Sequence, residues 1–227
     1  MIAAVPSTSE LRAISFDVGG TLIEPWPSVG HVYAGIAERF GITGVAPEAL
    51  NRGFALAWKD RGAFDYSHEA WRELVNQSFR GLCPDSPSLE CFDAMYESFA
   101  SAGTWRMFDD VLPTLAAVRQ RGWKLALISN WDERLRPLLR ELELIEHFDV
   151  ILVSHETGFT KPAPEMFHRA ACELGLPVES VLHIGDSMVE DFKAARSAGM
   201  RSMLLDRNAG YGASDSVNTL AAVLGLT

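Results

Sequence analysis

The chain has 227 residues, which suffices for one large domain or for a core with an insertion. Its formal net charge of −10 argues against nucleic acid or an acidic membrane as the main partner, because phosphate groups attract a basic surface. The chain has no apolar run long enough to span a bilayer, no export signal at its start and no C-x-x-C pair among its three cysteines, so we expect a cytoplasmic protein without disulfides or a zinc site.

The first predicted element is a buried strand over residues 12–16, which delivers a carboxylate, Asp17, into a glycine-rich turn. A carboxylate at the end of a buried strand is costly unless charge partners or a metal ion lie beside it. Gly19 and Gly20 allow backbone N–H groups to approach an anion closely, and Thr21 can tie the loop back on itself. The plain alternative is a tight turn in which Asp17 serves only as a cap.

Residues 29–99 show a helical pattern of apolar residues throughout. The apolar positions fall on one face of each predicted helix: Val32, Ile36 and Phe40; Leu50 and Phe54; Trp71, Leu74 and Val75; Leu89, Phe92, Tyr96 and Phe99. Loops near residues 41–47, 62–67 and 81–88 separate the helices. This pattern predicts four helices without a strand, inserted after the first strand through a proline-rich segment at 24–27.

From residue 108 onward, helices and strands alternate. The predicted helices span residues 113–121, 133–142, 164–174 and 188–198, and the predicted strands span 123–128, 148–153, 180–184 and 201–205. These strands are almost continuously apolar, as expected when helices cover both faces of a parallel sheet. We therefore predict an α/β fold: a Rossmann-like, doubly wound parallel sheet core of residues 1–24 and 107–227, with an inserted four-helix domain over 25–106.

Ligands of such sheets bind at the carboxyl ends of the strands, so the residues delivered there form the candidate site. In chain order they are Asp17, Ser129, Asn130, Lys161, Asp186 and Asp191. The set combines a carboxylate nucleophile, hydroxyl and amide donors, one cation and further carboxylates. Several carboxylates around one point must bind a hard cation or raise one another's pKa values, and Mg²⁺ suits ligands that are all oxygen.

Each candidate also has a purely structural interpretation. Ser129 and Asn130 could form an ordinary turn, with Asp132 as the N-cap of the next helix. Lys161 could be a solvated lysine in a proline-stiffened loop. Asp186 could cap the next helix, and Asp191 could be a solvated residue on its surface. His183, within an apolar strand, is expected to be a packed core residue.

The segments DVGGT, LISN, TKPAP and GDSMVED, in this order and each at a strand end, resemble the motifs of the haloacid dehalogenase-like hydrolase superfamily. The four-helix insertion is similar to the first cap type of that superfamily. The strings SNWDERLRPLLRELEL, FDVILVSHETGFTKPAPEMF and DFKAARSAGM resemble its subfamily I, above all the branch of haloacid dehalogenase-like hydrolase domain-containing proteins. The resemblance covers essentially the whole chain, more loosely in the insertion.

The resemblance implies a role for each matching residue. Asp17 is implied to attack phosphorus and form an aspartyl-phosphate, which divides one displacement into two easier ones. Asp17 and Asp186, with the backbone carbonyl of Gly19, are implied to ligate Mg²⁺, and Asp191 to orient Lys161 or a metal-bound water. The implied catalytic residues are Asp17, Ser129 and Lys161, and the residues expected to contact the phosphoryl group are Gly20, Thr21, Ser129, Asn130 and Lys161.

One position departs from the family pattern. Phosphatases of this superfamily usually carry a second aspartate two positions after the nucleophile as general acid and base, and this chain has Gly19 there. Losing a positioned proton donor typically costs ~10²–10⁴-fold in rate. Phosphonate cleavage, which relatives perform with a cap lysine, is disfavoured because the only lysine of the insertion, Lys59, has no supporting motif.

Three functions remain, in this order. The first is a Mg²⁺-dependent phosphatase that acts on a small phosphorylated metabolite through an intermediate on Asp17. The second is a 2-haloacid dehalogenase with a metal-independent ester mechanism, although such relatives do not keep the Gly-Asp pair found at 185–186. The third is a phosphate-binding protein with little turnover. We expect a small phosphorylated or halogenated substrate, no nucleic acid or membrane partner, and a monomer or homodimer.

Overall fold

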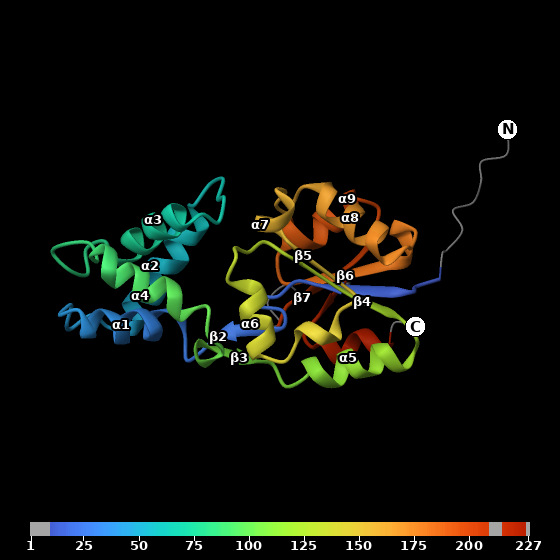
Figure 1. Cartoon of the computed structure of the whole chain (residues 1–227), viewed down its shortest axis with the longest axis horizontal. Helices are drawn as coiled ribbons and strands as arrows, with labels where there is room; N and C mark the ends of the chain where they lie inside the picture. The colour runs from blue at the N-terminus through green and yellow to red at the C-terminus, as the bar shows by residue number, and fades with distance from the viewer. Residues whose placement is uncertain (1–9, 209–214, 226–227) are drawn as a thin grey trace. The chain divides into compact units, whose positions relative to one another are not determined.

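A computed structural model describes residues 10–208 and 215–225 of the chain, which divides into two compact units (Figure 1). The first unit comprises Met1–Leu22, Asp109–Ser129 and Glu146–Thr227, and the second comprises Ile23–Phe108 and Asn130–Ile145. The second unit therefore contains one segment, 130–145, that the sequence analysis assigned to the core. The predicted domain boundaries stay a prediction, and the core residues predicted at 1–9, 209–214 and 226–227 lie outside the described residues.

The first unit is built on a six-stranded parallel sheet in the order β5-β4-β1-β6-β7-β8. Its strands are β1 (Ala13–Phe16), β4 (Lys124–Ser129), β5 (Val150–Val153), β6 (Val181–Gly185), β7 (Arg201–Leu205) and β8 (Ser216–Val217). From β1 the chain continues to β4 and β5 on one side of the sheet. It then returns to β6, which lies next to β1, and continues to β7 and β8 on the other side. In sheets of this order the ligand crevice lies where the direction reverses, outside the carboxyl ends of β1 and β6.

Helices cover both faces of this sheet. Figure 1 shows α8 (Pro164–Leu174) and α9 (Ala194–Ser197) on one face, and α5 (Val111–Gln120) with η5 (Leu220–Gly225) on the other. The shorter helical segments of the unit are α7 (Ser154–Thr157), η3 (Val178–Ser180) and the π-helical turn η4 (Met188–Lys193). Strand β1 is completely buried between these layers, which explains why it is apolar apart from Ser15. The predicted α/β, Rossmann-like fold class is confirmed.

The second unit contains the four helices predicted within residues 29–99. They are α1 (Val29–Arg39), α2 (Pro47–Lys59), α3 (His68–Phe79) and α4 (Leu89–Ser98). Three of them begin after a serine, at positions 28, 67 and 88, whose hydroxyl accepts the backbone N–H three residues on. This cap satisfies a donor that the first turn of a helix leaves unpaired. Their apolar faces meet in one core, which includes Tyr33, Leu50, Phe79 and Phe92.

Some local elements differ from the sequence-based expectation. Two short antiparallel strands, β2 (Ile23–Pro25) and β3 (Trp105–Met107), flank the four helices and were not predicted. Three residues are too few for a strand period to stand out. The helix predicted over 133–142 is shorter, α6 (Leu135–Glu141), and the one predicted over 188–198 is divided into η4 and α9. The remaining short segments are η1 (Ala102–Thr104) and η2 (Ile145–His147).

The described residues include no helix that is both long enough and apolar enough to cross a bilayer.

Candidate active site

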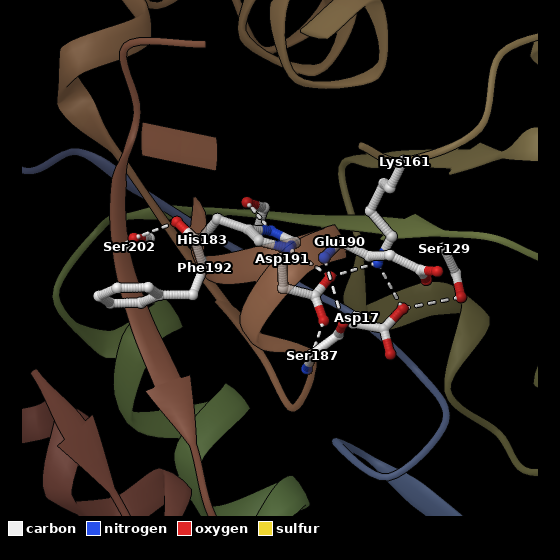
Figure 2. Close-up of polar contacts among 10 residues, drawn as sticks. Asp17, Ser129, Lys161, His183, Ser187, Glu190, Asp191, Phe192 and Ser202 are labelled. Carbon is white, nitrogen blue, oxygen red and sulfur yellow. Dashed lines mark hydrogen bonds and ion pairs between the residues drawn. The ribbon is translucent and has the colours of Figure 1, made fainter. Parts of the chain in front are cut away.

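Asp17 stands directly after β1 and is held by groups from two other parts of the first unit. Its backbone N–H donates to the carbonyl of Ile184 at 2.9 Å, which continues the pairing of β1 with β6. Its Oδ1 atom accepts hydrogen bonds from Lys161 Nζ at 2.7 Å and from Ser129 Oγ at 3.0 Å (Figure 2). The side chains of all three residues are buried. The predicted cation, Lys161, and the predicted hydroxyl donor, Ser129, therefore meet at the carboxylate of the predicted nucleophile, Asp17.

Asp191 lies on the other side of the same ammonium group. Its Oδ1 atom is 2.5 Å from Lys161 Nζ, and its Oδ2 atom accepts the backbone N–H of Ser187 at 3.0 Å. A Cβ atom on Gly185 would lie 2.3 Å from that Oδ2, so only glycine at 185 leaves room for the Asp191 carboxylate. The π-helical turn η4 carries Asp191 inward, where it is buried rather than solvated on a helix surface.

Asp186 follows β6 and faces the glycine-rich turn after Asp17. One carboxylate oxygen from each of Asp17, Asp186 and Asp191 lies within 4.8 Å of the others. Gly20 has a φ of +72°, and a Cβ there would fall 2.3 Å from Asp186 Oδ2. A side chain at position 20 would thus be strained and would also displace the carboxylate. The close approach of Asp186 therefore explains why the second residue of the pair Gly19-Gly20 is a glycine.

The pKa values of these groups follow from burial and from the crowding of charge. Burial raises the pKa of Asp17, although the Lys161 charge opposes the rise. Asp186 as a whole is exposed, but its carboxyl group faces the other two carboxylates, and loss of water with their repulsion raises its pKa to about 7. Burial would lower the pKa of Lys161, yet Asp17 and Asp191 outweigh it and raise the value. Burial opposes ionisation of Asp191 too, but Lys161 and His183 hold its pKa below the usual value.

The donor set fits a hard divalent cation. Three carboxylates and one ammonium leave two negative charges uncompensated when all are ionised, and the pKa of Asp186 is raised by burial together with that excess of charge. The ligand atoms that these three carboxylates offer to a metal ion are all oxygen, which Mg²⁺ and similar ions prefer. Both oxygens of Asp191 already accept protein hydrogen bonds. Asp17 and Asp186 are therefore the more available of the three as direct ligands.

The other predicted site residues lie in the loops beside this cluster. The turn after Asp17 is closed by hydrogen bonds from the backbone N–H groups of Thr21 and Leu22 to the carbonyl of Val18. Arg207 fixes the turn further by donating to the carbonyl of Thr21 at 2.7 Å. The Thr21 hydroxyl is buried and has no hydrogen-bond partner in the described part of the chain. Contact of Thr21 with a phosphoryl group stays a prediction.

Asn130 follows Ser129 directly but belongs to the second unit, where it begins the segment Asn130–Ile145, so its predicted phosphate contact also stays a prediction. The alternative in which Asp132 caps the next helix is wrong. Helix α6 begins at Leu135 without a side-chain cap, so Asp132 is not its N-cap. The Asp132 carboxylate accepts the backbone N–H of Arg134 at 3.1 Å in the turn before the helix and forms a buried ion pair with the Arg134 guanidinium at 2.5 Å. Trp71 from α3 donates its indole N–H to the same carboxylate at 2.8 Å.

Two residues that were not predicted as part of the site, Ser15 and His183, extend the charged cluster into the core. His183 is a packed core residue, as expected, but its Nε2 atom is 3.1 Å from Asp191 Oδ1, and its Nδ1 atom is 2.9 Å from Ser15 Oγ. The signal was present in the sequence as two polar residues, Ser15 and His183, inside strands that are otherwise apolar. An isolated polar residue in a buried strand requires a partner.

A family model described as haloacid dehalogenase-like hydrolase matches residues 11–199. The haloacid dehalogenase-like hydrolase domain-containing protein 3 of Bos taurus is 35% identical over 207 residues, which cover 86% of this chain and 82% of that protein. The phosphoglycolate phosphatase of Salmonella paratyphi A is 30% identical over 242 residues, covering 95% and 93% of the two chains. A 2-haloacid dehalogenase from Pseudomonas syringae pv. Tomato DC3000 aligns with a TM-score of 0.66 and 21% identity over 95% of this chain and 97% of that chain, a similarity of fold alone.

Proposed function

Because this chain belongs to the haloacid dehalogenase-like hydrolase family, we propose that it is a Mg²⁺-dependent phosphatase acting on a small phosphorylated metabolite through a phosphorylated Asp17. The observation that carries the proposal is the convergence of Asp17, Lys161 and Asp186 at the carboxyl ends of the parallel strands. The name of the Salmonella relative, a phosphoglycolate phosphatase, supports a phosphate ester as the substrate.

In the first step, an oxygen of the Asp17 carboxylate attacks phosphorus. A bond forms between that oxygen and phosphorus while the bond from phosphorus to the leaving oxygen breaks, and the leaving group takes the electron pair. In the second step, water attacks phosphorus and breaks the bond to Asp17, which releases inorganic phosphate and restores the carboxylate. Two displacements of this kind are each easier than one direct attack by water.

Lys161 and Ser129 prepare Asp17 for this chemistry. Their contacts with Oδ1 orient the carboxylate and offset its charge, which would otherwise repel a phosphate. When the phosphoryl group arrives, the same ammonium and hydroxyl can donate to its oxygens without moving far. Phosphoryl transfer depends mainly on such positioning and charge compensation, because little other covalent chemistry is required of the protein.

We propose that Asp17, Asp186 and the backbone carbonyl of Gly19 hold Mg²⁺. The ion, when bound, compensates the negative charge of the carboxylates and of the phosphoryl oxygens. Asp191 is engaged with Lys161 on one oxygen and with the Ser187 backbone on the other, which suits a role in orienting Lys161. The cytoplasmic location and the monomeric or homodimeric state stay predictions.

A phosphate- and halide-release screen with Mg²⁺ or with EDTA tests the proposal. We expect release of phosphate that requires Mg²⁺, loss of this activity in Asp17→Asn, and retention in Asp215→Asn, a control acid that is half exposed and paired with Arg196. Halide release that persists in EDTA would contradict the proposal and identify a dehalogenase. Absence of both activities across the screen, with phosphate binding retained, would identify a binding protein.

A further inference from the structure

Four contacts link five side chains in series, from Ser15 on β1 to Asp17 directly after β1, and Figure 2 shows the part that runs from His183 through Asp191 and Lys161 to Asp17. Ser15 contacts His183, His183 contacts Asp191, Asp191 contacts Lys161, and Lys161 returns to Asp17, two residues after Ser15. All five side chains are buried, so water does not compete for these contacts. Asp17 is therefore linked to two residues, Ser15 and His183, that are completely buried in the core.

His183 is held on three sides. Ser15 on β1 and Ser202 on β7 are its register partners in the two neighbouring strands, and the ring of Phe167 from α8 packs edge-on against the imidazole at 5.1 Å. Burial lowers the pKa of His183 although Asp191 opposes the shift, which favours the neutral ring with one proton. A carboxylate can only accept hydrogen bonds, so that proton lies on Nε2 and points at Asp191. The Nδ1 atom then accepts the Ser15 hydroxyl.

From this geometry we infer that Ser15 and His183 are positioning residues for catalysis, which orient Lys161 toward Asp17 by fixing the Asp191 carboxylate. This inference deepens the proposed function and rests on it for its activity measurements. The Ser15 hydroxyl selects the tautomer of His183, and the Nε2 proton fixes one oxygen of Asp191. Lys161 can then bridge Asp191 and Asp17 in a single geometry. Outer partners of this kind typically change activity about 10- to 100-fold when removed.

The first measurement is steady-state kinetics with Mg²⁺ on His183→Leu, His183→Gln and Ser15→Ala. Leucine removes the donor to Asp191, whereas glutamine can supply an amide N–H to it. We expect His183→Leu to lower kcat about 10- to 100-fold with little change in KM, and His183→Gln to recover most of the loss. Ser202→Ala is the matched control, because it removes a buried hydroxyl of the other neighbouring strand that donates to the Phe192 carbonyl and not to the chain of contacts.

The second measurement does not depend on enzymatic activity. The metal-free protein is treated with acetic anhydride, and acetylation of Lys161 is followed by peptide mass spectrometry, with the exposed Lys59 and Lys193 as internal references. We expect Lys161 to be protected in the wild type and in Ser202→Ala, and to react several-fold faster in Ser15→Ala and His183→Leu at unchanged reference rates. This result would hold even if the chain released no phosphate, so the two proposals fail separately.

Two outcomes would overturn the inference. The first is equal kcat and equal Lys161 protection in Ser15→Ala and the wild type. The second is a decrease in kcat and in Lys161 protection in Ser202→Ala as large as that in Ser15→Ala. It would show that any cavity beside His183 is enough to cause the decrease. Should His183→Leu fail to fold, the comparison of Ser15→Ala, His183→Gln and Ser202→Ala still decides between these results.

Discussion

The substitution Gly20→Ala tests whether the turn after Asp17 is shaped by the carboxylate of Asp186. The new Cβ atom would lie 2.3 Å from Asp186 Oδ2 and 2.8 Å from its Cγ, so the carboxylate must move by about 1 Å to reach ordinary contact. Gly122 provides a matched control within the same unit. Its φ of +74° is nearly that of Gly20 at +72°, yet a Cβ at 122 meets no described heavy atom within 4 Å.

The two alanine variants should differ in function rather than in stability. Each places an L-residue in the left-handed region, which costs about 1–2 kcal/mol. The collision at position 20 is relieved by rotating a short side chain, which adds little to the free energy of folding but moves a proposed metal ligand. A displacement of about 1 Å at a reacting centre can cost about 10²-fold in rate. We therefore expect similar melting temperatures for both variants and a loss of about 10²-fold in kcat/KM for Gly20→Ala alone.

Calorimetric titration with Mg²⁺, thermal melting and phosphate release on the two purified variants measure these effects. Gly20→Ala should bind Mg²⁺ more weakly than the wild type, and Gly122→Ala should bind it equally well. The reasoning is refuted if Gly20→Ala keeps wild-type Mg²⁺ affinity and kcat/KM, or if both variants lose activity in proportion to their loss of stability.

Three further predictions concern the leaving group, a buried ion pair and acid stability. Because Gly19 provides no proton donor, aryl and acyl phosphates should exceed alkyl phosphates in kcat/KM by about 10²-fold or more, and equal values across a leaving-group series would contradict this. Asp132→Ala leaves the buried Arg134 charge without its partner and should lower the unfolding free energy by about 3–5 kcal/mol in a denaturant titration. The double variant with Arg134→Met should recover more than half of that loss, and a loss in the double variant as large as in the single one would show that charge is not the cause. Burial would raise the pKa of Asp149, but hydrogen bonds from the Leu125 backbone and Arg119 lower it below the usual aspartate value of 3.8. Its stabilisation is therefore present above that pH and is lost as pH falls through the lower folded pKa, so melting curves of Asp149→Asn and the wild type should converge in acid and differ above pH 4. A constant difference at all pH values would exclude this explanation.

Much of the fold and the main charged cluster could be predicted from the sequence because both depend on local patterns. The alternation of apolar strands with amphipathic helices identifies the parallel sheet. The carboxyl ends of parallel strands share one edge, so Asp17, Lys161 and Asp186 could be brought together without knowing the strand order. Helix α8 was predicted to the residue, since Pro164 marks its start and Gly175, with a φ of 65°, follows its end.

Other features could not be predicted because they depend on register and on three-dimensional neighbours. The contact between Ser15 and His183 joins residues 168 positions apart and requires that β1 and β6 pair at those two residues. Asp132 was interpreted as a possible helix cap because one partner of its carboxylate, Trp71 on α3, is 61 positions away in the sequence. The π-helical turn that carries Asp191 inward has no distinct sequence period.

The central claim is that Asp17 carries the transferred phosphoryl group. Acid quench of the wild-type protein within the first turnover of a radiolabelled aryl phosphate, followed by mass spectrometry of the labelled peptide, tests this claim most directly. The account predicts a phosphoryl group on Asp17 that forms and decays at rates compatible with turnover and is absent in Asp17→Asn. Phosphate release with the label on another residue, or undiminished release by Asp17→Asn, would contradict it.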